Sequence, residues 1–176
     1  MARLWMSGLV VLTLAFGGCA STRSQSVRQA GYAGHPKRIY VLVMPELNNQ
    51  MGADFVQGSV AKLSDAIAKC GGILASHVSS ALELDASAQI PEIKAFNPDA
   101  VMSMDFAGGT RDQYGGWLPA RIDVRLWQPG AKQLAWRDTS SVSAGGFTPL
   151  STRVDSFIND LVQRMRTDNV FPDCNS

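Results

Sequence analysis

Residues 39 to 44, Ile-Tyr-Val-Leu-Val-Met, are the stretch that decides how the fold is predicted. They form a continuous apolar run, rich in residues that favour β-structure, and Pro45 closes it. A run without polar alternation is typical of a strand that is covered on both faces, as in a parallel sheet. We therefore predict a buried strand here, with helices from the flanking sequence packed over it.

The segment that follows predicts an alternation of helices and parallel strands. Residues 54–70 are expected to form an amphipathic helix ended by Gly71-Gly72, because apolar residues recur at helical spacing. These residues are Val56, Val60, Leu63 and Ile67. Residues 73–78 and 100–106 are predicted strands, and residues 85–96 a shorter helix with Pro91 in its first turn or breaking it. This order predicts right-handed parallel crossovers.

The last third of the chain has a different pattern. Residues 121–127 alternate strictly between apolar and polar, which predicts a strand with one solvent-exposed face, and residues 133–139 are expected to return antiparallel as a hairpin. A final helix is predicted from Thr148 as N-cap and Pro149 as first residue. Its expected buried stripe is Leu150, Val154, Phe157, Leu161 and Met165.

These elements predict an α/β fold that becomes α+β in its C-terminal half. The sheet is expected to be mixed, with about five strands and three helices in the order β-α-β-α-β-β-β-α.

The N-terminal segment indicates a lipid anchor. One charge, Arg3, precedes a short apolar core at residues 9–16, and Gly17-Gly18 leads to Cys19. The core is far shorter than the ~20 residues of a membrane-spanning helix. Gly-Gly-Cys resembles the lipobox of bacterial lipoproteins, although Phe16 stands where leucine is usual. The resemblance implies that the signal, residues 1–18, is removed and that Cys19 carries fatty acyl chains such as palmitate. Ala20 in place of aspartate implies the outer membrane. The other interpretations are an ordinary secretory signal or a retained anchor.

Residues 19–37 are polar and lack apolar periodicity, so a lipidated cysteine with a flexible tether is expected, followed by one periplasmic domain at residues 38–176. The 16 basic and 15 acidic residues nearly balance, which gives no electrostatic case for nucleic acid. If Cys19 carries lipid, Cys70 and Cys174 remain. In an oxidising periplasm they are expected to form a disulfide, the alternative being two separate thiols.

Two regions are candidate binding sites. The glycine-rich loop 107–119 carries Arg111, Tyr114 and Trp117, residue types that are enriched in binding hot spots; the alternative is a hairpin tip whose tryptophan folds back on its own sheet. The polar face of the following strand carries Arg121, Asp123, Arg125 and Trp127. This row would bind a carboxylate or a protein partner, or else form cross-strand ion pairs.

No catalytic or cofactor-binding signature is found. His35 and His77 have no partners at metal-ligand spacing, and no nucleophile elbow or phosphate-binding fingerprint occurs. We therefore predict a protein that is not an enzyme and that uses neither metal nor cofactor.

The order of elements, with residues 97–101 entering a strand and residues 133–137 in a late hairpin, resembles small bacterial outer-membrane lipoproteins and, distantly, the α/β domains of the LpoB and TolB amino-terminal type. The resemblance implies a lipid-anchored, non-catalytic accessory domain that binds an envelope protein. The alternatives are a subunit of an oligomeric secretion or assembly complex, including a homo-oligomer, and a periplasmic small-ligand binder or enzyme.

Overall fold

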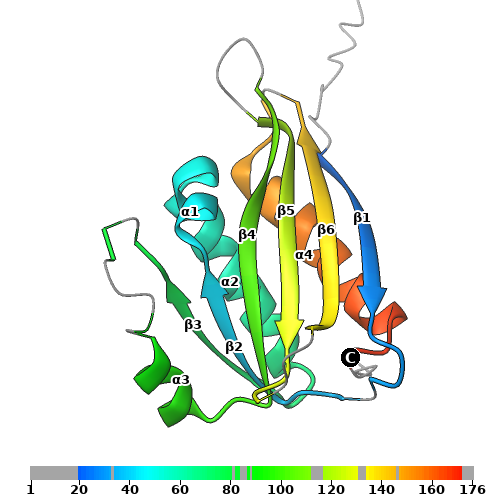
Figure 1. Ribbon diagram of the computed structural model, residues 1–176. Helices are drawn as coiled ribbons and strands as arrows, with labels where there is room; N and C mark the ends of the chain where they lie inside the picture. Colours follow the sequence, from blue (N-terminus) through cyan, green and yellow to red (C-terminus); the bar gives the residue numbers. More distant parts are fainter. Residues whose placement is uncertain are drawn as a thin grey trace, which may run out of the picture.

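The computed structural model describes residues 20–32, 34–80, 82–83, 87, 89–111, 117–130, 134–145 and 147–171. Within these residues, six strands form one mixed sheet in the order β1-β6-β5-β4-β2-β3, and four helices pack on it (Figure 1). The predicted α/β fold with a mixed sheet is confirmed, although the structure adds one strand and one helix to the expected number.

The sheet has a parallel part and an antiparallel part. Strands β2 and β3 run parallel to each other, and β4 pairs parallel with β2. The antiparallel part continues from β4 through β5 and β6 to the edge strand β1. The bounds are β1 Ala20–Arg28, β2 Arg38–Val43, β3 Ile73–Val78, β4 Ala100–Arg111, β5 Trp117–Trp127 and β6 Leu134–Ala144.

Three helices lie behind the sheet in the view of Figure 1. They are α1 (Pro45–Met51), α2 (Ala53–Ala68) and α4 (Leu150–Thr167). The core lies between these helices and the sheet, where Phe55 of α2 stacks on Phe157 of α4 with ring centroids 5.9 Å apart. Alternate residues of β5 point into this core, because Ile122, Val124 and Leu126 are all fully buried. None of the described helices is long and apolar enough to cross a membrane.

The fourth helix, α3 (Ile90–Phe96), packs near the strands β2 and β3. Tyr40 of β2 contacts Phe96, and its hydroxyl donates a hydrogen bond of 2.8 Å to Glu92. The Arg38 guanidinium lies 4.7 Å from the centre of the Phe96 ring. No described helix covers the front face of β4, β5, β6 and β1 (Figure 1).

The flexible tether predicted for residues 19–37 is wrong for residues 20–28, which form the nine-residue strand β1. This strand is polar on both faces, so it has no apolar alternation that would predict it. Its inward side chains contact α4 through hydroxyl groups: Thr22 hydrogen-bonds Ser156 at 2.8 Å, and Ser24 donates to Asp160 at 2.5 Å. Nine residues of the expected tether therefore belong to the sheet.

Smaller corrections concern helix ends. The sequence pattern predicted no element between the strand ending before Pro45 and the helix at 54–70, whereas α1 occupies Pro45–Met51. Pro149, not Thr148, is the N-cap residue of α4, and its cap has no side-chain hydrogen bond. Leu150, expected in the buried stripe, is 40% exposed because it begins the helix, whereas the other four stripe residues are buried.

Candidate functional site

The uncovered side of β4, β5, β6 and β1 carries four arginines, and we call it the arginine face. Arg121 and Arg125 come from β5, Arg137 from β6 and Arg23 from β1. The strand register sets them in two rows. Arg125 lies opposite Arg137, and four residues along the strands Ser141 lies opposite both Arg121 and Arg23. The sequence predicted Arg121 and Arg125 in this position, but it gave no sign of Arg23 or Arg137 joining them.

Asp123 lies between the two rows, opposite Thr139, and binds both arginines of the first row. Arg137 forms a fork, with Nε 2.8 Å from Oδ1 and Nη2 3.1 Å from Oδ2 of Asp123. Arg125 donates from Nε at 2.7 Å to Oδ2. The Thr139 hydroxyl adds a hydrogen bond of 3.1 Å to Oδ1. The interpretation of this row as cross-strand ion pairs therefore holds for Asp123 with Arg137 of β6, whereas Arg125 pairs with Asp123 within β5.

Asp123 itself was expected on a solvent-exposed face, which is wrong, because its residue is only 2% exposed. The two guanidinium groups and Thr139 cover it. Burial raises the pKa of the Asp123 carboxyl, but hydrogen bonds from Arg137, Arg125 and Thr139 outweigh burial and hold that pKa below its ordinary value. The same contact raises the pKa of Arg137. Asp123 therefore stays ionised and holds the two arginines in place.

The second row holds Arg23 and Arg121 on either side of Ser141. Neither arginine forms a hydrogen bond or ion pair with any residue that the structure describes. Gly108 of β4 makes room for Arg121, because a Cβ atom at residue 108 would lie 3.3 Å from Arg121 Nη2. The glycine pair at 108–109 was assigned to a loop, whereas it lies in β4 beside a β-bulge.

The other predicted binding residues do not gather in one site. Arg111, at the end of β4, is exposed and donates from Nη2 to Gln50 of α1 at 3.0 Å. Trp117 lies opposite Arg111 at the start of β5, and Trp127 lies at the far end of the same strand, half-buried. Tyr114 lies outside the described residues. The structure therefore pairs Arg111 with Trp117 at one end of the β4–β5 ladder and places Arg121, Arg125 and Trp127 along the rest of β5.

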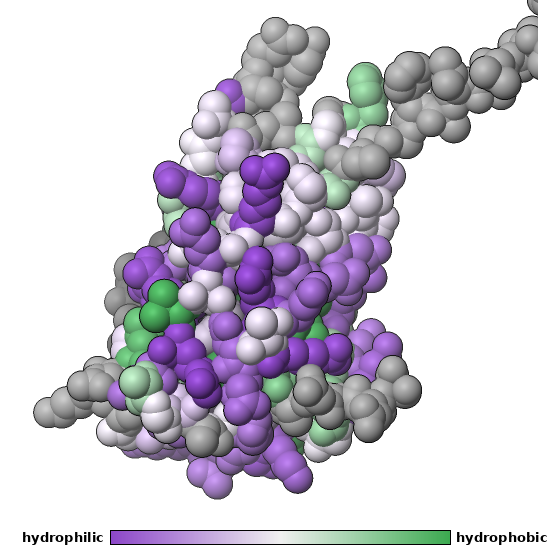
Figure 2. All heavy atoms as spheres, turned by 90° about the vertical axis from the view of Figure 1, so that its right-hand side faces the viewer, coloured by the Kyte–Doolittle hydropathy of each residue, from purple (hydrophilic) through white to green (hydrophobic). Residues whose placement is uncertain are grey.

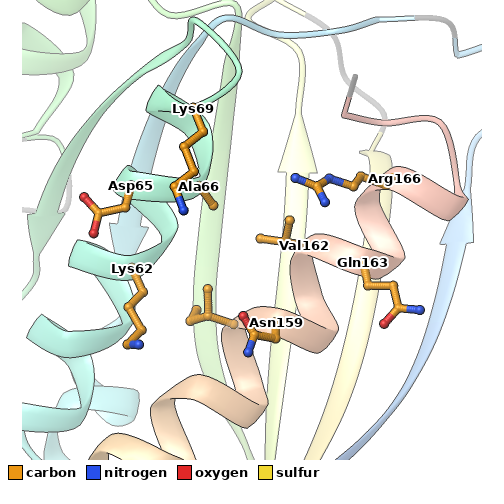
Figure 3. A pocket seen from close by; sticks show the side chains of 9 residues that line it. Lys62, Asp65, Ala66, Lys69, Asn159, Val162, Gln163 and Arg166 are labelled. Carbon is orange, nitrogen blue, oxygen red and sulfur yellow. The ribbon is translucent and has the colours of Figure 1, made fainter. Parts of the chain in front are cut away.

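A second hollow lies between α2 and α4, on the opposite side of the sheet (Figure 3). Its volume is about 490 Å³, and the buried residues Ile158 and Val162 of α4 are among those that line it. Lys69, directly after α2, and Arg166 of α4 lie at its sides, and Arg166 extends toward α2 (Figure 3). Helical periodicity predicted the two helices but not that they pack against each other.

His77 of β3 has partners that sequence spacing did not show. Its Nε2 lies 3.3 Å from Glu83, and its Nδ1 lies 3.3 Å from Glu92 of α3. Glu92 also accepts the Tyr40 hydrogen bond, and burial, followed by the contact with Glu92, raises the pKa of Tyr40 to about 12. Through Glu92, the contacts with His77 of β3 and Tyr40 of β2 hold α3 against the sheet. Among the described residues, no group of three or more His, Cys, Asp or Glu side chains could hold a metal ion.

The three cysteines are only partly described. Cys70 follows α2, is half-buried and packs against the core. Cys19 and Cys174 lie outside the described residues, so the lipidation of Cys19 and the disulfide between Cys70 and Cys174 stay predictions.

Known structures share this fold at low sequence identity. The PelC dodecamer from Paraburkholderia phytofirmans superimposes with a TM-score of 0.52 and 14% identity, over 80% of this chain and 95% of that chain. A single-substitution variant of that dodecamer gives a TM-score of 0.50 and 14% identity, over 81% of this chain and 95% of that chain. Lipoprotein GNA1162 from Neisseria meningitidis gives 0.45 and 14%, over 73% of this chain and 99% of that chain.

No protein-family model and no curated protein sequence matches the chain. The two PelC structures establish that this arrangement of sheet and helices is a known fold. The more specific resemblance to LpoB and TolB domains stays a prediction.

Proposed function

We propose that this protein is a lipid-anchored periplasmic accessory domain that binds an envelope protein through its arginine face and catalyses no reaction. The observation that carries the proposal is the absence of any described helix over four neighbouring strands whose exposed side chains include four arginines. Arginine is favoured at protein interfaces because its planar guanidinium forms several directed hydrogen bonds. Asp123 fixes two of these guanidiniums before any partner binds.

An apolar side chain on the same face supports this use. Val27 of β1 lies opposite Arg137 and is 74% exposed. Interfaces commonly combine apolar contact area with fixed polar groups. Arg125 and Arg137 remain 39% and 53% exposed despite their contacts with Asp123, so both guanidiniums are within reach of a partner.

The anchor belongs to the same proposal. β1 begins at Ala20, the residue after Cys19, so acyl chains on Cys19 would attach directly to the sheet. Two or more acyl chains hold a protein stably on a bilayer, each buried methylene contributing about 0.8 kcal/mol. We place the domain on the periplasmic face of the outer membrane, where the Cys19–Ala20 pair would direct it. Labelling with a clickable fatty acid should mark the wild-type chain and leave a Cys19→Ala variant unlabelled.

Photocrosslinking in cells tests the binding proposal. A photoreactive residue at position 27 should capture one dominant envelope protein. The matched control is the same residue at Gln57, an exposed position of α2 on the opposite layer. Capture of the same protein from both positions, or from neither, would contradict binding through the arginine face.

A second function, subunit of an oligomeric assembly, is favoured by the fold that this chain shares with PelC dodecamers. Light scattering of the full chain extracted in detergent measures its mass without the detergent contribution. A mass of many subunits, together with self-crosslinks from position 27, would support this function. A monomer at all concentrations would exclude it.

A further inference from the structure

We propose that the hollow around Arg23 and Arg121 binds a phosphate group. The hollow has a volume of about 600 Å³ and lies along β1, β6 and β5, with α4 at one side. Three arginines and five uncharged polar residues line it, and none of these lining residues carries a carboxylate. They are Thr22, Arg23, Ser24, Gln25, Arg121, Thr139, Ser141 and Arg164. Figure 2 views the molecule from the side of β1, where hydrophilic residues predominate.

Arg125 and Arg137, the neighbouring pair of arginines on the same face, bind a carboxylate, whereas Arg23 and Arg121 bind none that the structure describes. There, the Asp123 carboxylate lies between Arg125 and Arg137 and accepts hydrogen bonds from both. Between Arg23 and Arg121 the register places Ser141, whose hydroxyl can donate a hydrogen bond but carries no negative charge. Asp123, two residues from Arg121 on the same face, accepts hydrogen bonds from Arg125, Arg137 and Thr139 and none from Arg121 or Arg23. An oxyanion bound between Arg23 and Arg121 would supply the directly bonded counter-charge that these two guanidiniums lack.

The spacing suits one oxyanion shared by both arginines. β1 and β5 are separated by β6, so Arg23 and Arg121 are two strand spacings apart, about 9–10 Å. Long arginine side chains can close on a tetrahedral group from the two sides of such a gap. Arg164 lines the hollow from α4, but its Nε donates at 2.9 Å to Ser24 on the α4 side of β1, and the Ser24 hydroxyl also donates to Asp160. The proposed contacts to the phosphate therefore come from Arg23 and Arg121. Guanidiniums and hydroxyls together offer more donors than one carboxylate accepts, which favours phosphate with its larger charge and its additional oxygen acceptors.

The phosphate has two sources, a soluble phosphate compound or the headgroup of an anionic phospholipid. Arg23 is four residues beyond Cys19, about 13 Å along an extended strand. The lipid source therefore rests on the proposed anchor at Cys19, because only an anchored chain holds the hollow beside the headgroups. The phosphate site itself does not depend on the anchor or on a protein partner.

Nuclear magnetic resonance of the arginine Nε–Hε groups tests the site in the full chain, purified in a non-ionic detergent. Inorganic phosphate, compared with chloride at equal ionic strength, should shift the Arg23 and Arg121 signals and leave Arg38 unmoved. Arg121→Gln and Arg23→Gln should each weaken phosphate binding at least tenfold. Arg166→Gln, which removes an arginine from α4 outside the hollow, should leave it unchanged.

Micelles doped with phosphatidylglycerol distinguish the two sources. Shifts with inorganic phosphate support a soluble ligand, and shifts with the doped micelles alone support a headgroup. No shift with either probe, or equal shifts at Arg38, would overturn the site even in the unaltered protein. Because this measurement contains no envelope protein, its failure leaves the crosslinking test from position 27 unaffected, and the reverse also holds.

Discussion

Asp123 and Asp138 are both buried in the sheet, yet they give opposite dependences of stability on pH. Asp123 is ionised between two arginines, so replacing it with asparagine leaves two guanidiniums without their counter-charge. We expect Asp123→Asn to lower the free energy of unfolding by about 1–2 kcal/mol at pH 7, less than a fully buried pair because the arginines are partly exposed. Urea denaturation measures it.

The sign of the pH effect follows from the lowered pKa of Asp123. Its stabilisation is complete above the unfolded-state pKa, about 4, and is lost as the pH falls through the lower folded-state pKa. The difference in the free energy of unfolding between the wild type and the Asp123→Asn variant should therefore become smaller below about pH 4. Asp105, opposite Asp123 on β4, is the matched control. An equal loss in Asp105→Asn would show that general charge, and not the arginine contacts, sets the effect.

Asp138 of β6 is fully buried on the side of the sheet that faces α4, where Ser140 donates to Oδ2 at 2.6 Å. Burial, the largest cause, raises its carboxyl pKa from 3.8 to about 6. The folded protein therefore holds the proton more tightly, and stability falls as the pH rises from about 4 to about 6.

We expect Asp138→Asn to raise the free energy of unfolding by about 2 kcal/mol at pH 7.5 and to leave it unchanged near pH 4. Asparagine keeps the acceptor for Ser140 and removes the buried charge. Denaturation of both proteins at the two pH values measures the difference. A change that is the same at both pH values would show that ionisation of Asp138 is not its cause.

At the scale of elements, β1 is held by polar contacts with α4. Ser24 donates to Asp160 and accepts from Arg164 Nε at 2.9 Å, so its hydroxyl joins the two charged residues. We expect Ser24→Ala to lower the free energy of unfolding by about 1–2 kcal/mol, because the hydroxyl's hydrogen bonds to the charged Asp160 and Arg164 are lost. Ser21→Ala, at an exposed position of the same strand, should change it by less than about 0.5 kcal/mol. Equal effects at both positions in thermal unfolding would contradict this role.

The sequence predicted the strands and the two long helices whose inward side chains are mainly apolar and missed the strand whose inward side chains are polar. The run at residues 39–44 and the stripe that includes Leu63 and Ile67 reflect burial of whole side chains, and the structure places both in the core. β1 lacks that signal because its inward residues are serine and threonine, whose value to the fold depends on Ser156 and Asp160 more than 130 residues away. No local pattern can report such a contact.

The candidate site was predictable to the same limited degree. Alternation placed Arg121 and Arg125 together, since a strand fixes residues two apart on one face. Arg137 and Arg23 join them through pairing with β6 and β1, and pairing partners depend on the order of the strands. Gln25 of β1 and Thr139 of β6 line the hollow for the same reason, because strand pairing places them on this face. Predicting an interaction surface on a sheet therefore requires the strand order and register, and the sequence of one strand determines neither.

At the scale of the whole molecule, the chain after α4 returns to the core, because Val170 and Phe171 are buried. Cys70 follows α2 and packs against that core. A disulfide between Cys70 and Cys174 would close a loop of about 100 residues and stabilise the fold by about 4 kcal/mol in the chain-entropy model. Reduction should therefore lower the unfolding midpoint in urea.

Thiol counting decides whether this bond forms. The mature chain, denatured without reductant, should show no free thiol, because the Cys19 sulfur carries lipid and the other two cysteines are bonded. The Cys70→Ser variant should show one free thiol, which is Cys174, and its unfolding midpoint should match that of the reduced wild-type chain. Two free thiols in the unreduced wild-type protein would rule the disulfide out. The stability of the chain end would then depend on the packing of Val170 and Phe171 and on their backbone hydrogen bonds to Met165.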